Sequence, residues 1–345
     1  MRADPPQPSL GGREGQTTKQ THPNPPCEGG RAKRLNRLIP QTTKRLIPQT
    51  TKRLIPQTTK RLIPQTTNMI FARDKSQMCN NLLQFAHVYA WAREHDRSVM
   101  SMRFSYKYRF FKICHTKYTC FPMYLFAKYA AALRLLPTAR FKQKDNPAVS
   151  EQLMVRHKHV VVSGWFCRWY DLFLKYRSEI CDLFTIDSQY STAVSQRMSQ
   201  CEAEPCNDRV RLGVHIRRGD YKDFKGGKYF YSDEKYAAYI DAFAQMMQGK
   251  QVEVYLSTND PEVTADKFRT LVNQPNAHIH LLGGNAVEDL SMLSECDYVM
   301  GPPSTYSLVA VMYRDIPLLR MDTAPADTLT IKDFKLFDYW FRRII

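Results

Sequence analysis

The alternation of hydrophobic and polar positions divides the chain after residue 68 into alternating strands and helices. Residues 69–73 (MIFAR) form an apolar run typical of a buried strand, and residues 82–95 place apolar side chains at helical spacing. A second strand is predicted in residues 98–104 (SVMSMRF), and residues 159–166 (HVVVSGWF) predict a further strand that leads to a helix through Leu183. Strands that alternate with helices favour a parallel sheet.

The pattern restarts at Val210 after a polar, weakly periodic segment, residues 189–209, which we interpret as an interdomain boundary. From there on, strands and helices alternate again. The predicted strands are residues 211–217, 252–258, 277–283 and 296–301, and the predicted helices are residues 233–248 and 261–272, the second beginning at Pro261. The second half is therefore predicted to be a doubly wound α/β domain.

Residues 1–68 carry a short repeat in place of such a pattern. Residues 37–67 read RLIPQTTK three times and RLIPQTT once. A proline in every unit blocks helix formation, and the unit is far shorter than the roughly 20 to 50 residues of repeats that stack into a core. We interpret residues 1–68 as a disordered basic tail, either an arm for RNA or lipid headgroups or a translated tandem repeat upstream of a true start at Met69. The identical copies and the lack of interleaved aromatic residues favour the second interpretation.

The net charge of +17 is concentrated in this tail. Residues 1–68 contain 13 Lys and Arg and 3 Asp and Glu, which gives +10 and leaves +7 for residues 69–345. The body is mildly basic, which fits an anionic substrate or a membrane surface as well as nucleic acid. With 43% hydrophobic residues, the chain can bury a core.

The nine cysteines form neither a CxxC pair nor the framework of a small secreted protein. The tightest clusters, residues 114–120 and 201–206, lack the short spacing of a structural zinc site, so we expect reduced thiols and no bound metal. No uncharged apolar run reaches the roughly 18 residues of a membrane span, and residues 1–30 lack a signal-peptide core. These features predict a cytoplasmic protein.

Residues 124–136 (YLFAKYAAALRLL) predict a helix that combines apolar side chains with Lys128 and Arg134. A basic amphipathic helix of this kind can lie on a membrane, which would give a peripheral contact with the inner membrane face. The alternative is a helix that packs on the core and exposes its two cations. We prefer the second interpretation because such helices are commoner.

A cationic pair, Arg217 and Arg218, stands where the strand that begins near Arg211 ends. The alternation places His215 and Arg217 on one face, and the polar stretch after Arg218 indicates a loop. Ligands of open α/β sheets bind at the carboxyl ends of the strands, where paired guanidinium groups suit a phosphate. A solvated edge or a chance Arg-Gly-Asp tripeptide would give the same letters.

The motifs HIRRGD (215–220) and GPPSTYSLVAVMY (301–313) resemble those of the α1,2-fucosyltransferases of glycosyltransferase family 11, which share motifs with α1,6- and protein O-fucosyltransferases. CNNLLQFA (79–86), GWFCRWYDLF (164–173) and STNDPEV (257–263) are similar to further stretches of the family, in the same order. The chain departs from the family in the segment before Asn80, where KSQMC replaces a glycine-rich turn.

The resemblance implies a GT-B fold, in which two Rossmann-like domains face a cleft. Residues 69–206 would form the acceptor-side domain, and residues 207–345 the domain that binds the GDP-sugar. Breaking the sugar–phosphate bond leaves negative charge on the β-phosphate. The sequence contains no Asp-x-Asp pair for a divalent metal, so we expect no metal and no other cofactor.

The family motifs imply roles for individual residues. Arg217 would hold the β-phosphate, Arg218 would support donor binding or the loop, and His215 and Asp220 would shape the site. The hydroxyls of Ser304 and Thr305 would bond the same phosphate at a helix N-terminus, and Ser307 belongs to the same donor-binding motif.

Four carboxylates complete the expected site. Asp289 matches the family position that reads guanine, although it could also be the N-cap of a helix that begins near Leu290. Asp260 occupies the acidic position of STND, where a turn residue would look the same. Asp223 and Asp74 are candidates for the general base.

We therefore predict a metal-independent, inverting enzyme that transfers fucose from GDP-fucose to a hydroxyl, galactose O2, of a glycan in surface polysaccharide or lipid-linked oligosaccharide synthesis. One alternative keeps the phosphate site and changes the nucleotide sugar. A second alternative is a basic nucleic-acid-binding protein without enzymatic activity. A third is a folded copy that has lost its activity.

Overall fold

The structure is a computed structural model, and it describes residues 68–73, 76–202 and 208–343, all of which belong to one compact unit. The predicted tail lies outside the described residues except for residue 68. Asp74 and the predicted domain boundary between residues 206 and 207 also lie outside them.

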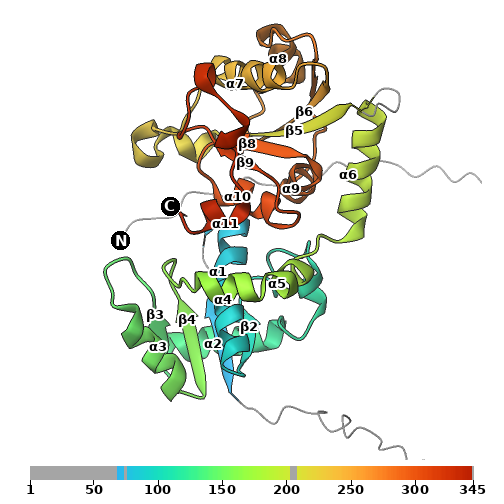
Figure 1. The fold of residues 1–345 in the computed structure, drawn as a ribbon. Coiled ribbons are helices and arrows are strands. Elements are labelled where there is room, and N and C mark those ends of the chain that lie inside the picture. The colour runs from blue at the N-terminus through green and yellow to red at the C-terminus, as the bar shows by residue number, and fades with distance from the viewer. Residues whose placement is uncertain (1–67, 74–75, 203–207, 344–345) are drawn as a thin grey trace, which may run out of the picture. The chain divides into compact units, whose positions relative to one another are not determined.

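The first half of the described chain contains a parallel sheet with the strand order β2-β1-β4-β3 (Figure 1). Its central strand is short and almost entirely buried, as its apolar run predicts. The strands are β1 (Met69–Arg73), β2 (Ser98–Ser101), β3 (Thr138–Arg140) and β4 (His159–Ser163). The helices of this half are α1 (Met78–Glu94), α2 (Phe121–Ala132), α3 (Pro147–Arg156), α4 (Tyr170–Lys175) and α5 (Arg177–Leu183), with the 3₁₀ turn η1 (Lys112–His115).

The two faces of this sheet are covered differently. Ile70 and Ala72 of β1 point into the main core together with α1, which is buried along most of its length. Phe71 points to the other face, where it meets Ala127 of α2 in a smaller cluster. The alternation along β1 thus assigns α1 and α2 to opposite faces.

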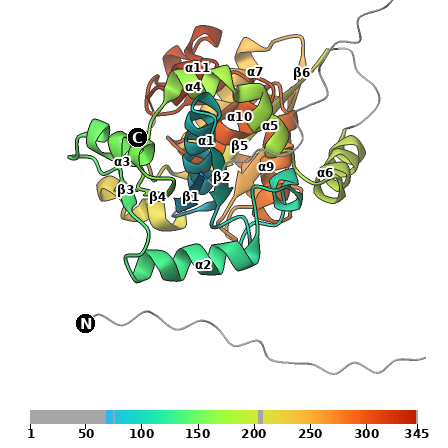
Figure 2. The same ribbon diagram turned by 90° about the horizontal axis from the view of Figure 1, so that it is seen from below.

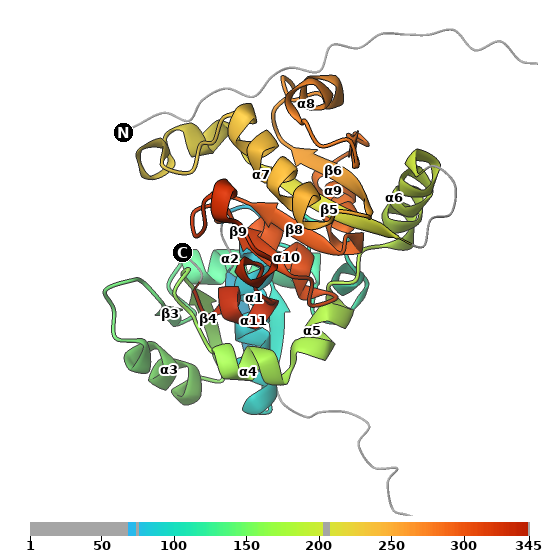
Figure 3. The ribbon, with the colours of Figure 1, turned by 45° about the horizontal axis from the view of Figure 1, so that its top comes forward.

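The second half contains the sheet β7-β6-β5-β8-β9, in which every pair is parallel (Figure 3). The strands are β5 (Arg209–Ile216), β6 (Gln251–Thr258), β7 (Ala277–His280), β8 (Tyr298–Gly301) and β9 (Leu318–Arg320). The helices are α7 (Asp233–Met246), α8 (Ala265–Leu271), α9 (Ala286–Glu295), α10 (Thr305–Met312) and α11 (Phe337–Phe341), with η2 (Gly219–Lys222), η3 (Phe224–Gly227), η4 (Ala326–Thr328) and η5 (Ile331–Asp333). This confirms the predicted α/β class with parallel sheets.

Three predicted strands end three residues early in the structure, at Ser101, Ser163 and His280, and the predicted course of two helices was wrong. The helix expected to begin at Pro261 begins at Ala265, because Thr264 is its N-cap and accepts a hydrogen bond from the Lys267 N–H at 3.3 Å. The helix expected to run through Leu183 is interrupted at Tyr176, which ends α4 and begins α5.

The segment predicted as a polar linker is largely a helix, α6 (Ser188–Cys201). Val194 and Met198 are its buried residues, so its apolar stripe is narrow and its periodicity weak. Polar contacts hold it on α9: the Ser195 hydroxyl donates to Glu295 at 2.8 Å, and Arg197 pairs with Glu288 at 2.7 Å. Tertiary contacts therefore specify a helix that the hydrophobic pattern did not reveal.

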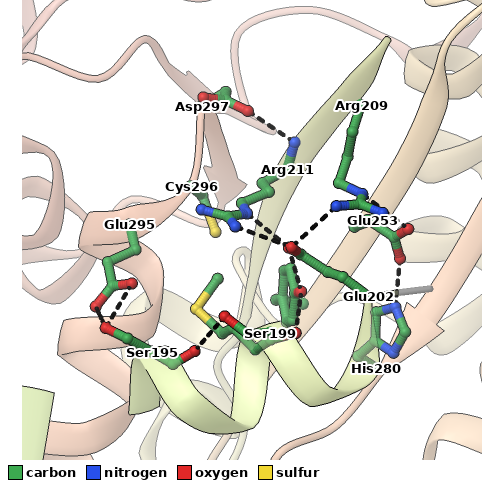
Figure 4. Close-up of polar contacts among 12 residues, drawn as sticks. Ser195, Ser199, Glu202, Arg209, Arg211, Glu253, His280, Glu295, Cys296 and Asp297 are labelled. Carbon is green, nitrogen blue, oxygen red and sulfur yellow. Dashed lines mark hydrogen bonds and ion pairs between the residues drawn. The ribbon is translucent and has the colours of Figure 1, made fainter. Parts of the chain in front are cut away.

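Just after α6, Glu202 joins an ionic cluster at the start of the second sheet (Figure 4). Its carboxylate lies 2.6 Å from Arg211 and 3.2 Å from Arg209, both on β5. Arg209 also lies 3.5 Å from Glu253 of β6, which pairs with His280 of β7 at 2.5 Å. The cluster links the end of α6 to three adjacent strands.

The last described helix, α11, returns to the helices of the first half. The Phe341 ring stacks on His87 of α1 and lies 4.3 Å from the Phe173 ring of α4. Arg177 lies over the Phe337 ring at 4.7 Å, and Arg342 pairs with Asp171 at 2.8 Å. Helices of both halves thus share one core cluster.

Candidate active site

A cleft of about 560 Å³ lies at the carboxyl ends of β5, β8 and β9. Parallel neighbours end at the same sheet edge, and here Arg217 follows β5, Ser304 and Thr305 follow β8, and Arg320 ends β9. The facing wall comes from the start of α1 and from Gly164 and Trp165 after β4. The cleft lies between parts of the chain that carry the two sheets.

Arg217 is the predicted phosphate ligand, and it lines this cleft. Its guanidinium group pairs with Asp220 at 2.8 Å and lies 5.6 Å from the centre of the Tyr221 ring. Its side chain is 23% exposed, so the charge is held in place and stays accessible. Asp220 also lines the cleft, with its side chain 59% exposed, and it is the only carboxylate among the described lining residues.

His215 lies two residues before Arg217, near the end of β5, and it is buried. Its Nδ1 and the Ser307 Oγ are 2.7 Å apart, which ties β5 to α10. Burial, with a smaller contribution from the nearby Arg217 charge, lowers the pKa of His215 to about 3. A neutral His215 therefore positions the strand exit and adds no charge there. Neither His215 nor Ser307 lines the cleft.

Ser304 and Thr305 line the cleft at the start of α10. Ser304 is the N-cap and accepts a hydrogen bond from the Tyr306 N–H at 3.1 Å. The Thr305 hydroxyl donates to the Asn80 Oδ1 on α1 at 2.6 Å, across the cleft. The N-terminus of α10 presents backbone N–H groups and the positive end of the helix dipole beside Arg217, an arrangement that suits an anion.

Arg218 points away from the cleft. It is buried, its guanidinium contacts the Tyr231 carbonyl oxygen and Asp233, and its backbone N–H donates to the Asn259 Oδ1 at 2.9 Å. The two arginines thus separate into an accessible and a buried one. Of the two roles expected for Arg218, these contacts favour support of the loop over direct donor binding.

Asp260 lies in the turn after β6, outside the cleft lining. Its Oδ1 accepts a hydrogen bond from the Glu262 N–H at 3.0 Å, and its other oxygen is 3.9 Å from Arg218. This is the hydrogen-bond pattern of a turn residue. Its contact with Arg218 is the connection that the structure shows between Asp260 and the residues beside the cleft.

Asp289 is in the first turn of α9, and it is not the N-cap of that helix. Asn285 holds that position and forms a capping box with Glu288. The Asp289 Oδ2 accepts a hydrogen bond from the Ser257 hydroxyl at 3.0 Å, and burial raises the pKa of Asp289 to about 6. The cleft lining includes Ala286, three residues before Asp289, and does not include Asp289 itself.

Of the two candidates for the general base, Asp223 is outside the cleft lining. It is exposed, although Tyr221 and Phe224 on either side of it line the cleft. Asp74 lies outside the described residues. In the part of the chain that the structure describes, no group of three or more His, Cys, Asp and Glu side chains is arranged to hold a metal ion.

Sequence reasoning missed much of the cleft wall. Trp165, Arg320, Trp340 and Arg343 line it, and Arg320 lies 5.0 Å from the centre of the Trp340 ring. Trp165 lies within a stretch that resembles a family segment, whereas the last three come from a region without a recognised motif. Arg320 could have been noticed as a charge that ends an apolar strand, LLR.

The fold and the cleft define a glycosyltransferase of the GT-B class. The sequence model of glycosyl transferase family 11 matches residues 57–314, which include the exits of β5 and β8. The chain belongs to glycosyl transferase family 11. The resemblance inferred from HIRRGD and its companion motifs is confirmed. No curated protein matches this chain by sequence.

Solved fucosyltransferases have a similar fold. An arginine-to-lysine mutant of Arabidopsis thaliana FUT1 in complex with GDP superposes with a TM-score of 0.51 and 12% identity, covering 78% of this chain and 73% of that chain. NodZ from Bradyrhizobium gives 0.46 and 13%, covering 74% and 96%. POFUT1 in complex with GDP gives 0.46 and 12%, covering 72% and 94%. The first of these confirms the expected GT-B arrangement.

Proposed function

We propose that this protein transfers fucose from GDP-fucose to a hydroxyl group of a glycan, with inversion and without a metal. The observation that carries the proposal is the placement of Arg217 beside the N-terminus of α10, at the edge of a cleft in a family 11 chain. Fucosyltransferases of the same fold have been solved with GDP, which supports this donor.

In the proposed reaction, the bond between C1 of fucose and the β-phosphate oxygen breaks, and its electron pair stays on the phosphate. Arg217, the Ser304 and Thr305 hydroxyls and the N–H groups of α10 stabilise that charge. The acceptor oxygen forms the new bond to C1 from the opposite face. In this proposal Asp289 accepts hydrogen bonds from guanine at the end of β6, where it contacts Ser257, and the neighbouring strand β5 leads to Arg217.

The acceptor proton has no strong base to receive it among the described lining residues. Asp220 is the carboxylate of that lining, and it is already paired with Arg217. We propose a transition state in which the C1–O bond is largely broken before the proton leaves, so that solvent or Asp220 accepts it late.

We propose galactose O2 as the acceptor hydroxyl, in surface polysaccharide or lipid-linked oligosaccharide synthesis, and a cytoplasmic location. Trp165 and Trp340 in the cleft wall support a sugar acceptor, since aromatic faces pack well on sugar rings. Seven cysteines in the described residues are unpaired, which supports a reducing compartment. In the described residues, no helix is both long and apolar enough to cross a bilayer.

The test is GDP release by the full chain with GDP-fucose, EDTA and a panel of galactose-terminated glycans. We expect release by the parent and a loss of at least roughly a hundredfold in Arg217→Ala, because one charge-stabilising donor typically contributes that much. Arg269→Ala, an exposed residue of α8, is the control and should keep its activity. Absence of release, together with no rise in melting temperature on addition of GDP-fucose, would contradict the proposal and point to another nucleotide sugar or an inactive copy.

A further inference from the structure

Helix α2 exposes a second apolar stripe that the fold does not use. Its inner side, with Ala127 and Ala130 buried, covers the first sheet. Its outer side carries Phe126 and Tyr129, which are 56% and 59% exposed, and the stripe continues to Leu133, at 70%. Figure 2 shows α2 running along the outside of the first sheet. The preferred sequence interpretation, a helix that packs on the core and exposes its two cations, is therefore incomplete, because this segment also exposes apolar side chains.

The exposed side chains form one patch rather than a scatter. Phe121, Phe126, Tyr129, Leu133 and Leu135 are among the exposed large hydrophobic residues of the described chain, and they lie within 15 residues of one another. Their spacing of three and four residues puts Phe126, Tyr129 and Leu133 on one helix face. A helix that is apolar on both sides needs a second apolar neighbour, and a monomeric surface rarely leaves such a patch open.

The residues that flank this patch in the sequence carry charge of a single sign. Between Asp96 and Asp145, residues 97–144 contain 11 Lys and Arg and no Asp or Glu. Lys128 lies on α2 itself, 5.6 Å from the centre of the exposed Tyr129 ring, and the exposed Arg134 follows the helix. Aromatic and leucine side chains surrounded by cations match the boundary of an anionic bilayer, where rings sit at the headgroup level and cations meet lipid phosphates.

We propose that the outer face of α2, with residues 133–135, docks the protein on an anionic lipid surface, with Phe126, Tyr129 and Leu133 inserted and Lys128 and Arg134 at the headgroups. Nucleic acid is disfavoured because leucine side chains offer no stacking surface for bases. The inference is independent of the proposed reaction, since it depends on no residue of the cleft.

The test uses the full chain and two kinds of vesicle, phosphatidylcholine alone and phosphatidylcholine with phosphatidylglycerol, in a sedimentation assay. The variant Phe126→Gln/Leu133→Gln removes apolar surface and leaves the net charge, including that of residues 1–68, unchanged. The matched control is Ile331→Gln/Leu336→Gln, which changes two exposed hydrophobic residues of the second half, 44% and 51% exposed.

We expect the parent and the control to bind the anionic vesicles equally, and Phe126→Gln/Leu133→Gln to bind at least roughly tenfold more weakly, because two apolar side chains no longer leave water. Lys128→Gln/Arg134→Gln should also lose roughly tenfold, and only on the anionic vesicles. Equal binding by parent and Phe126→Gln/Leu133→Gln, or no binding by the parent, would overturn the proposal.

Two other binding partners of the patch would each give a different experimental result. A dimer of the parent that becomes monomeric in Phe126→Gln/Leu133→Gln, seen by light scattering without vesicles, would assign the patch to a second copy of the chain and overturn the lipid proposal. The same would hold if an oligoribonucleotide, and not the vesicles, lost binding in that variant.

Discussion

The adjacent residues Arg217 and Arg218 have different surroundings and, we infer, different roles. Arg217 is accessible at the cleft, whereas the Arg218 side chain is 8% exposed and contacts the buried carboxylate of Asp233. Both residues follow β5, which ends at Ile216, and the backbone is still extended at Arg218, so consecutive side chains there point to opposite sides. The two faces here are a ligand site and a core of tyrosine rings, including those of Tyr231 and Tyr236.

Replacing Arg218 should therefore affect stability more than donor binding. In Arg218→Ala, Asp233 keeps Lys267 at 2.5 Å but loses its buried partner, and we expect a loss of about 3 kcal/mol in the free energy of unfolding. Arg217→Ala should lose less than about 1 kcal/mol, because its guanidinium reaches solvent. Urea unfolding of both variants measures this difference. Equal losses in the two variants would show that Arg218 is not a specifically structural residue.

The raised pKa of Asp289 predicts a pH dependence of donor binding. Only the ionised carboxylate accepts hydrogen bonds from both guanine N–H groups, and burial raises the Asp289 pKa to about 6. Affinity should therefore fall as the pH falls, by about fourfold between roughly pH 7.5 and pH 5.5, since about a quarter of the groups stay ionised at the lower value.

Calorimetry with GDP-fucose measures this effect without interference from the ligand, because the phosphates of a nucleotide sugar are diesters and do not titrate in this range. Asp289→Asn should bind more weakly at every pH and lose the dependence. A parent whose affinity is the same at both pH values would speak against Asp289 as the guanine ligand.

At the scale of elements, the ionic cluster around Glu202 holds α6 and β5 together. In Glu202→Ala, Arg209 and Arg211 would lose their shared carboxylate, and the Tyr255 hydroxyl would lose its acceptor at 2.8 Å. We expect the free energy of unfolding to fall by about 3 kcal/mol, since two partly buried arginine charges lose a carboxylate, although Arg209 keeps Glu253 at 3.5 Å.

Urea unfolding compares this variant with Glu262→Ala, a control at an exposed residue before α8, which should change stability by less than about 0.5 kcal/mol. If Glu202→Ala were no less stable than the control, water would be replacing the carboxylate and the cluster would not fasten the two elements.

The hydrophobic pattern predicted most strands and the long helices, and it failed where packing decides. The apolar runs of β1, β5, β6 and β8 identify these segments as strands, because strands buried on both faces consist mostly of apolar residues. Helix α6 has two buried residues in fourteen, and hydrogen bonds to α9 hold it in place. Its sequence therefore lacks the apolar periodicity by which a helix is predicted. Helix α2 packs on the core as the sequence favoured, but the pattern did not show that Phe126 and Tyr129 on its outer side stay exposed.

At the scale of the molecule, α11 joins the second half of the chain to the first. Phe341 is fully buried between His87 and Phe173, both from helices that cover the first sheet. The cleft residues Trp340 and Arg343 lie on or beside the same helix. Packing at α11 therefore supports one wall of the proposed active site.

Phe341→Ala should lower the free energy of unfolding by about 3 kcal/mol, the usual cost of an aromatic cavity in a core. Because the two halves share this core, tryptophan fluorescence and circular dichroism should still report one urea transition, at a lower concentration. Tyr339→Ala on the same helix, 41% exposed, is the control and should change little. Two separate transitions in the parent would show that the halves unfold independently.

The sequence alone determined the α/β class, the family and the motifs that we propose bind phosphate, because strand burial, glycine and proline positions and two arginines after a strand depend on neighbours close along the chain. The tertiary structure decided which of the two arginines reaches the cleft, that Asp223 does not, and that Trp340, Arg320 and Arg343 do. Those outcomes depend on how distant segments pack, since the parts of the wall that come from β9 and α11 have no recognised motif in either segment.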